Sequence, residues 1–450
     1  MAAQRPLVDH LLDGLAWLVG HGLFRTVEVA GADRIPRDQP IVIVANHSNG
    51  LVDAVLLAII VRGLPRFVAT ATLWRSPVVR PLLALAGLVP VSRPEDHDVD
   101  TVDNAALFGR AHDILRRSGT LAIFPEGTTH DHLELQRVRT GAARIALGAR
   151  DAGVDGVSVV PIGLTFDDKL ALRSRVLARV GQPISVHHWV ERWALRHHVD
   201  PASVSSDDRD AVVALTEVIR TTLLESTPRY GDVLDRAMLN RAADVRLRSD
   251  LRDPEEIVSL AGRERLAQAI ADAPERARRS VLDALGTYQV QLDLLRLRDE
   301  HLVPRVHATW LLRKVVGLAL YLAVLGVIVV TGIAVNLLPT ALTAMAGRRP
   351  RAPVTKGTVR VLTALIVFPL TWAMLAILAP VTGWLPTLAV FLVCPVAGAV
   401  AVGGLERAIA LVRAWLGWLG LRNARELLDH VAQARHRVCE QVDIAAAQRL

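Results

Sequence analysis

The chain has 450 residues, 51% of them hydrophobic and 22% charged, a balance too apolar for an ordinary soluble protein and too charged for a bundle made only of membrane helices. Its formal net charge of +7 comes from an arginine-rich set of basic residues, which reflects GC-rich codon usage or serves contacts with phosphates. Its two cysteines, Cys394 and Cys439, exclude a disulfide framework and a cysteine-based zinc site, which fits a reducing cytosol. We therefore expect a soluble domain joined to a short membrane region.

Residues 1–25 contain an apolar segment that is predicted to form an amphipathic helix at a membrane interface. Asp9, His10, Asp13 and His21 interrupt its apolar residues, which argues against a signal peptide or a complete membrane span. The apolar residues recur at helical spacing. The helix therefore lies among lipid headgroups or packs on its own domain, and both placements are open from the sequence.

Residues 26–190 alternate between short apolar runs and longer periodic segments. This pattern is typical of an α/β domain with a mostly parallel sheet flanked by helices. Because the short runs are apolar on both faces, we expect buried strands. The predicted strands are 41–45, 66–70, 88–91, 120–124 and 158–164. The predicted helices are 51–61, 77–86, 100–118 and 141–152.

The remaining residues divide into three predicted segments. Residues 191–300 combine dense charge with apolar residues at helical spacing, which predicts an appended helical segment. Residues 301–405 are predicted to be a membrane region, because the blocks 315–346 and 361–405 are apolar for longer than the ~20 residues of one span. Residues 406–450 return to a charged pattern and predict a helical tail.

Basic residues flank both apolar blocks, for example Arg313, Arg351 and Arg407. Since short basic loops stay on the cytoplasmic side, each block is expected to cross the bilayer an even number of times. We therefore predict two hairpins, with a bend near Asn336–Pro339 in the first. Because residues 315–346 are short for two full spans, the first is expected to be a re-entrant hairpin. The soluble domain is then expected on the cytoplasmic face of the cell membrane.

The apolar run 41–45 is followed by a histidine and an aspartate, His47 and Asp53. They stand six positions apart, so they meet only if His47 lies in the turn before a helix and Asp53 in its first turn. Ser48 or Asn49 is the predicted N-cap of that helix. A carboxylate bonded to one imidazole nitrogen makes the other nitrogen a better base. The alternative is an aspartate that favours a helix N-terminus beside an incidental histidine.

Two further motifs follow predicted strands. Arg93 comes directly after the strand 88–91, where a guanidinium is placed to hold a phosphate, although a surface arginine is the default in this chain. Glu126 and Gly127 follow the strand 120–124. Main-chain N–H groups beside Gly127 are placed to bind an oxyanion or phosphate. The alternative is an ordinary turn from strand to helix in which a threonine caps the helix.

The order of these motifs resembles the four blocks of the glycerolipid acyltransferase family, the glycerol-3-phosphate and lysophosphatidate acyltransferases. The blocks are Asn46-His47, Pro90-Val91-Ser92-Arg93, Phe124-Pro125-Glu126-Gly127-Thr128 and Val160-Pro161-Ile162-Gly163. The usual family pattern has four residues between the histidine and the aspartate, and this chain has five. It is more similar in this respect to the fungal glycerol-3-phosphate/dihydroxyacetone-phosphate acyltransferases.

The resemblance implies a role for each matching residue. His47 is expected to be the general base and Asp53 to orient it. The residues expected to position or bind substrate are Asn46, Ser48, Arg93, Glu126, Gly127, Thr128, Arg139, Lys169 and Arg173. Arg93 is expected to hold the acceptor phosphate, and Glu126 the acceptor hydroxyls.

The resemblance also implies an activity, which is the transfer of a fatty acyl group from acyl-CoA or acyl carrier protein to a hydroxyl of glycerol 3-phosphate in phospholipid biosynthesis. No metal or other cofactor is expected, nor a nucleic-acid partner, and the oligomeric state is left open. A lysophosphatidate or other lysophospholipid acceptor is the alternative. A non-catalytic lipid-binding membrane protein is the second alternative.

Overall fold

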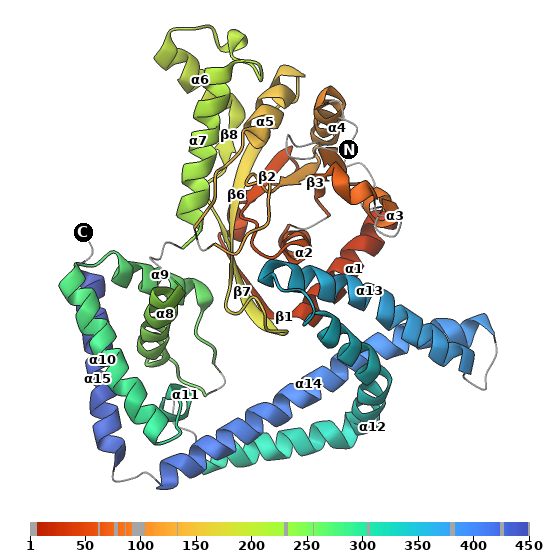
Figure 1. Cartoon of the computed structure of the whole chain (residues 1–450). Coiled ribbons are helices and arrows are strands. Elements are labelled where there is room, and N and C mark those ends of the chain that lie inside the picture. Colours follow the sequence, from red (N-terminus) through yellow and green to blue (C-terminus); the bar gives the residue numbers. More distant parts are fainter. Residues whose placement is uncertain are drawn as a thin grey trace. The chain divides into compact units, whose positions relative to one another are not determined.

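The computed structural model describes residues 7–61, 64–75, 80–85, 87–91, 104–132, 134–228, 233–254, 256–303, 307–378, 383–423 and 427–448. The chain divides into two compact units. Unit 1 comprises residues 1–229 and 351–358, and unit 2 comprises residues 230–350 and 359–450. Figure 1 draws the elements of both units.

Unit 1 is built on an eight-stranded sheet in which the order is β1-β7-β6-β2-β5-β3-β4, with β8 paired to β6. The strands are β1 (Phe24–Ala30), β2 (Ile41–Ala45), β3 (Arg66–Thr70), β4 (Val89–Val91), β5 (Thr120–Ile123), β6 (Ser158–Phe166), β7 (Ser174–Val180) and β8 (Ile184–Ser185). The pairs β6–β7 and β6–β8 are antiparallel, and the other described pairs are parallel. The predicted mostly parallel sheet is therefore confirmed.

Strand β2 lies inside the sheet between β5 and β6, where Ile43 aligns with Ala122 and with Val160. Every residue of β2 and of β6 is buried. This burial explains why both runs are apolar without alternation. Because β2 and β5 are parallel, the segments that leave their carboxyl ends start from the same edge of the sheet.

Helices cover the sheet of unit 1. They are α2 (Leu51–Ile60), α3 (Arg80–Leu85), α4 (Asn104–Arg116), α5 (Gly141–Asp151), α6 (Val186–His197) and α7 (Arg209–Ser226). Val42 of β2 belongs to one buried cluster with Leu115 of α4, Leu147 of α5 and Leu215 of α7. Figure 1 shows α5 and α7 running beside the strands. This apolar cluster fixes the strands whose ends carry the motifs.

The N-terminal helix α1 (Leu7–Leu23) packs on its own unit with one face and exposes apolar side chains on another. Asp9 forms an ion pair at 2.8 Å with Arg66 of β3. Gly20 lies so close to α2 that a Cβ there would stand 2.0 Å from Ile59. Leu11 is 66% exposed and Trp17 is 56% exposed. The two placements considered for this helix are therefore compatible, because the exposed face remains available to lipid.

The predicted strands 41–45 and 66–70 match β2 and β3, and the other three predicted strands overlap β4, β5 and β6. Strands β1, β7 and β8 were not predicted. The predicted helices 51–61 and 141–152 match α2 and α5 to within one residue. Residues 77–79, 86 and 100–103 of the other two predicted helices lie outside the described residues. Helix α3 occupies the described part of the first, and α4 ends at Arg116, two residues before the predicted end of the second.

Unit 2 contains a group of charged helices around their own apolar core. They are α8 (Val233–Arg248), α9 (Leu260–Ala271), α10 (Glu275–Leu294), α11 (Asp299–Leu302) and α15 (Leu428–Ala447). Leu239, Ile270 and Leu285 share this core with Val438 of α15. The part of the predicted helical segment from α8 onward therefore shares a core with α15 of the predicted tail, whereas the part from residue 191 to residue 229 lies in unit 1.

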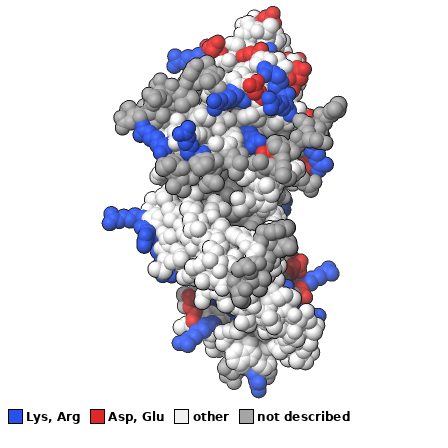
Figure 2. Space-filling view, turned by 90° about the vertical axis from the view of Figure 1, so that its right-hand side faces the viewer, with Lys and Arg blue, Asp and Glu red and all other residues white. Residues whose placement is uncertain are grey.

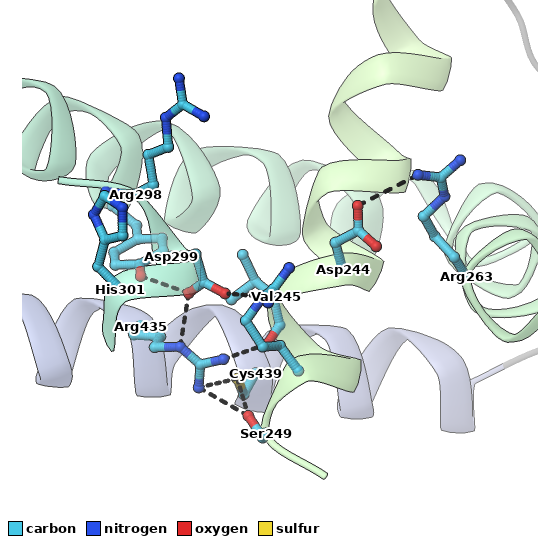
Figure 3. Close-up of polar contacts among 11 residues, drawn as sticks. Asp244, Val245, Ser249, Arg263, Arg298, Asp299, His301, Arg435 and Cys439 are labelled. Carbon is cyan, nitrogen blue, oxygen red and sulfur yellow. Dashed lines mark hydrogen bonds and ion pairs between the residues drawn. The ribbon is translucent and has the colours of Figure 1, made fainter. Parts of the chain in front are cut away.

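A buried polar network links these helices, and Figure 3 shows it centred on Asp299 and Arg435. Arg435 is 8% exposed; it donates to Asp299 Oδ1 at 2.8 Å, to Ser249 Oγ at 2.8 Å and to the Val245 carbonyl at 2.6 Å. Tyr288 also donates to Asp299 Oδ1, at 2.7 Å. Burial and the adjacent Asp299 carboxylate raise the pKa of Tyr288. The buried guanidinium thus has both an opposite charge and hydrogen-bond acceptors, as a buried charge requires.

Three helices of the described chain are long and apolar enough to cross a membrane: α12 (Ala308–Ala346), α13 (Pro353–Leu378) and α14 (Trp384–Asn423). Their surfaces expose many large apolar side chains, such as Val327 and Ile377 at 83% each. Figure 2 shows a wide area of the surface without charged side chains. The membrane region predicted from composition is present as these helices.

The first apolar block differs from the predicted hairpin. Residues 308–346 form the single helix α12, with Pro339 inside it. Figure 1 shows that α12 bends along its course, and proline has that effect because it removes one main-chain hydrogen bond without ending the helix. The described residues of the second block lie in two helices, α13 and α14. Helix α14 also continues to Asn423, past the predicted boundary at residue 405.

The three apolar helices share a buried asparagine. Asn336 of α12 donates to the carbonyls of Gly332 at 3.0 Å and of Cys394 at 3.1 Å. Its own oxygen accepts from Trp372 Nε1 of α13 at 3.1 Å. A Cβ on Gly398 of α14 would lie 3.0 Å from the Asn336 amide nitrogen. One polar side chain therefore joins three helices, as is typical of membrane bundles.

Candidate active site

The first motif occupies the turn between β2 and α2. The amide of Asn46 donates to the Leu164 carbonyl at 3.0 Å and accepts from the Leu164 N–H at 2.7 Å. These two bonds extend the contact between β2 and β6 past the end of β2. The N-cap of α2 is Gly50, without a side-chain cap, so the predicted Ser48 or Asn49 cap is wrong. Gly50 adopts φ 57° and ψ −129°, a backbone conformation that only glycine adopts readily.

The predicted meeting of His47 and Asp53 is present. His47 Nδ1 lies 3.0 Å from Asp53 Oδ2, and the same oxygen accepts from the Asn49 N–H at 2.7 Å. Asp53 lies in the first turn of α2, as the spacing required. Its side chain is fully buried, whereas that of His47 is 18% exposed. Because a carboxylate only accepts, Nδ1 carries the proton and Nε2 has the free lone pair.

The ring of His47 is held from a second side by Phe124. Their ring centroids are 4.0 Å apart and their planes lie at 13°. Phe124 follows β5 directly, so the adjacent parallel strands β2 and β5 deliver the two rings to one edge of the sheet. Nε2 of His47 makes no hydrogen bond with the part of the chain that the structure describes. The imidazole is therefore fixed in orientation with one nitrogen available for chemistry.

Glu126 is occupied by donors from the protein itself. It is 3% exposed, and its Oε1 accepts from the His47 N–H at 2.8 Å. Its Oε2 accepts from the Gln136 N–H at 2.7 Å and pairs with His130 Nε2. The His130 N–H in turn donates to the His47 carbonyl at 3.3 Å. Glu126 therefore fixes the main chain of the histidine loop, and its predicted contact with acceptor hydroxyls stays a prediction.

Gly127 and Arg139 lie side by side. Gly127 has φ 74°, and a Cβ there would stand 2.9 Å from Arg139 Nε. The Arg139 N–H donates to the Pro125 carbonyl at 2.8 Å, which folds the segment before α5 back onto the motif. Thr128 is exposed and Ser48 is buried. The structure thus brings Asn46, Ser48, Gly127, Thr128 and Arg139 around the histidine and Glu126.

The other predicted substrate residues lie in different surroundings. Lys169 Nζ lies 3.2 Å from Asp131 Oδ1, so it joins the loop that follows Glu126. Arg173 donates to the carbonyls of His21 and Phe24, the latter at 3.0 Å, where α1 passes into β1. A cation is stabilised at the C-terminal end of a helix. Arg173 therefore has a structural role here, and Arg93 lies outside the described residues.

Three partners of the site were not predicted: Phe124 as a stacking ring, His130 as the partner of Glu126 and the main-chain N–H of Gln136. The sequence Thr129-His130-Asp131 does carry a signal, because a histidine stands four residues after the glutamate. The sequence carries no signal for the Gln136 contact, because the donor is a main-chain N–H group and does not depend on the residue type. Chemically, the arrangement is a base oriented by a buried carboxylate beside a loop fixed by a second carboxylate.

Comparisons with known proteins agree with this domain. Residues 26–165 match the Acyltransferase family. Glycerol-3-phosphate O-acyltransferase 1 of Saccharomyces cerevisiae is 30% identical over 132 residues, which are 29% of this chain and 16% of that protein. Glycerol-3-phosphate O-acyltransferase 2 of the same yeast is 39% identical over 88 residues, 19% of this chain and 12% of that protein. The chain thus matches less than a fifth of the length of either yeast relative.

A bacterial relative matches more of its own length. The 1-acyl-sn-glycerol-3-phosphate acyltransferase of Borreliella burgdorferi is 24% identical over 206 residues, 45% of this chain and 75% of that protein. A solved structure, the 1-acyl-sn-glycerophosphate acyltransferase of Thermotoga maritima, aligns over 50% of this chain and 81% of its own, with 20% identity and a TM-score of 0.34. The resemblance inferred from the four motifs is confirmed by the family match and the sequence relatives.

Proposed function

We propose that this chain, whose residues 26–165 match the Acyltransferase family, is a membrane-bound O-acyltransferase that acylates a hydroxyl of glycerol 3-phosphate. The observation that carries the proposal is the 3.0 Å contact between His47 Nδ1 and the buried Asp53 carboxylate, which leaves Nε2 as a base at the sheet edge. The donor is a thioester of coenzyme A or of acyl carrier protein. The reaction so proposed needs no metal and no other cofactor.

The proposed chemistry uses both nitrogens of the His47 imidazole. Nε2 accepts the proton of the acceptor hydroxyl as its oxygen attacks the thioester carbonyl, and Asp53 stabilises the imidazolium that forms. The tetrahedral intermediate then expels the thiolate, which takes the proton from His47. An ester bond forms and a thioester bond breaks, so the proton balance closes within one turnover. A general base of this kind contributes ~10²–10⁴-fold in rate.

The acceptor assignment rests on two observations. The two yeast relatives are named glycerol-3-phosphate O-acyltransferases, and five residues separate His47 from Asp53, as in the fungal pattern. The relative from Borreliella burgdorferi is named for 1-acyl-sn-glycerol-3-phosphate, so lysophosphatidate is the second acceptor to test. The proposal places the catalytic unit on the cytoplasmic face of the cell membrane, where soluble thioesters and glycerol 3-phosphate are present.

The test is acyl transfer by the purified full chain with acyl-CoA or acyl carrier protein and a panel of acceptors, with the products identified by mass spectrometry. We expect acylated glycerol 3-phosphate from the wild type, and a loss of ~10²–10⁴-fold in rate in His47→Ala and Asp53→Asn. His188→Ala is the matched control, because His188 lies in α6 with a side chain that is 65% exposed. Product from His47→Ala at the wild-type rate, or release of no thiol by the wild type, would refute the proposal. The latter result would favour a lipid-binding protein.

A further inference from the structure

We propose that Gly357 and Thr358 are positioning residues for the loop that carries His47 and Asp53. Both lie near the start of α13, in the short stretch 351–358 that belongs to unit 1. The proposal rests on the function proposed above. It adds two residues that lie far outside residues 26–165, the part of the chain that matches the acyltransferase family.

Thr358 supplies the cap that α2 lacks. The N–H of Leu51, the first residue of α2, has no acceptor within its own helix. Gly50 at the N-cap offers no side chain to accept it. Thr358 Oγ1 accepts from this N–H at 3.1 Å. A residue 307 positions further along the chain thus caps the N-terminus of α2, the helix that carries Asp53.

Gly357 allows the close approach that this bond needs. It is buried, and a Cβ there would lie 2.6 Å from Asn49 Oδ1 and 2.8 Å from Val52 Cγ2. Contacts below 3.0 Å force a neighbour to move. Asn49 is itself 4% exposed, so its side chain has little free space. Any larger residue at position 357 therefore displaces the loop at Asn49.

The same close fit occurs on the loop side. A Cβ on Gly50 would lie 2.3 Å from Thr358 Oγ1. Each segment therefore brings one glycine close to side chains of the other segment. Gly50 also has a positive φ of 57°, so a substitution there would confound strain with lost contact. Variants of α13 are for this reason the cleaner test.

The contact leads to the base in two steps. The Asn49 N–H donates to Asp53 Oδ2, and Asp53 Oδ2 accepts from His47 Nδ1. A shift of Asn49 therefore changes the hydrogen bonding of the carboxylate that orients the base. The described contacts of Gly357 and Thr358 are with residues 49–52, so the expected effect is on the geometry of the loop. Loosened positioning lowers the rate of the chemical step and leaves ground-state binding of both substrates unchanged.

The experiment compares three variants with two matched controls in the purified full chain. Thr358→Val removes the acceptor and keeps the shape, Thr358→Ser restores an acceptor, and Gly357→Ala adds one methyl group. Thr355→Val is the control for the first, because Thr355 is exposed on the same helix. Gly317→Ala is the control for the last, because a Cβ there would meet nothing within 4 Å.

Two readouts are needed. Steady-state kinetics with acyl-CoA and glycerol 3-phosphate give kcat and both KM values. Hydrogen exchange of the peptide that covers residues 47–57 reports on the Leu51 N–H without any catalysis. We expect Thr358→Val and Gly357→Ala to lower kcat by about tenfold or more, with both KM values unchanged within about twofold. Exchange of the peptide is faster in both variants, Thr358→Ser restores both readouts, and the controls match the wild type.

Several results overturn the inference. Wild-type kcat and exchange in Thr358→Val mean that the bond does not hold the loop. A raised KM at unchanged kcat means that Thr358 contacts a substrate instead. Equal losses in the two controls mean that any change in these helices lowers activity. A wild-type chain without acyl transfer refutes the proposed function, and the positioning role falls with it, but the exchange measurement then still reports whether the contact exists.

Discussion

The Glu126→Gln variant distinguishes two possible roles of Glu126. The family resemblance predicts that Glu126 binds the hydroxyls of the acceptor, so its loss raises the KM for glycerol 3-phosphate. The structure places its two oxygens on two main-chain donors, the N–H groups of His47 at 2.8 Å and of Gln136 at 2.7 Å. The second account therefore predicts a loss in kcat.

The size of the effect follows from the hydrogen bonds. A glutamine has one oxygen and one NH₂ group at the positions of the two carboxylate oxygens. Whichever way the amide is turned, one of the two N–H groups faces another donor. A buried donor left without an acceptor costs ~1–3 kcal/mol. If that cost falls on the placement of His47 during the chemical step, kcat drops by ~5–150-fold.

The assay is initial-rate thiol release from acyl-CoA with varied glycerol 3-phosphate. Glu134→Gln is the matched control, because Glu134 is an exposed residue on the same loop. We expect Glu126→Gln to lower kcat with the KM for glycerol 3-phosphate unchanged, and the control to behave as the wild type. A KM raised tenfold or more at constant kcat would contradict the structural reasoning and support the role inferred from the family.

Two further predictions concern stability. Asn336→Leu removes three hydrogen bonds, two of which join α12 to α13 and α14. At ~0.6–1.7 kcal/mol for each interhelical bond in a membrane, the melting temperature in detergent should fall, whereas Leu337→Ala, at an exposed neighbour, should leave it nearly unchanged. Equal melting of the two variants would speak against the network. Burial, followed by the charge of Arg116, lowers the pKa of His112. Because the folded protein disfavours the charged imidazole, stability is complete above the unfolded pKa of about 6.5 and is lost as the pH falls below it. Melting between pH 7.5 and 5.5 should therefore depend less on pH in His112→Gln than in the wild type, and an identical slope would count against this assignment.

Much of unit 1 was predictable because its determinants are local. The runs 41–45 and 66–70 are apolar and short, and they form β2 and β3 at the predicted bounds. Strand β7 escaped prediction because Arg175 and Arg179 interrupt its apolar residues, and β8 has only two residues. Their places in the sheet come from pairing with β6, which local pattern does not encode.

The apolar helices were predicted less well than the strands of unit 1. The basic residues that flank the first block predicted a hairpin, with a bend near Asn336–Pro339, whereas the structure keeps one helix through Pro339. Within this region Asn336 donates to carbonyls of α12 and α14 and accepts from Trp372 of α13, and a sequence pattern cannot reveal such partners.

Within the site, the sequence identified the residues but not their partners. His47 and Asp53 are six positions apart, so their meeting could be inferred from helix geometry alone. Glu126 stands 79 positions from His47, and its bond goes to a main-chain N–H, which every residue except proline possesses. Its hydrogen bond to the main chain of the histidine loop could therefore not be predicted from residue types.

The bond between Leu51 and Thr358 has a consequence for the time at which the protein becomes active during its synthesis. A ribosome that adds ~5–20 residues per second needs roughly 15–60 s to pass from one residue to the other, which are 307 positions apart. During this interval the nascent chain has its histidine and its aspartate but lacks the cap of α2. The segment that supplies the cap is made after the first apolar helix, α12, and directly before the apolar remainder of α13. If Thr358 positions the loop as proposed, the loop of His47 therefore reaches its final geometry only after the chain has produced α12, its first long apolar helix.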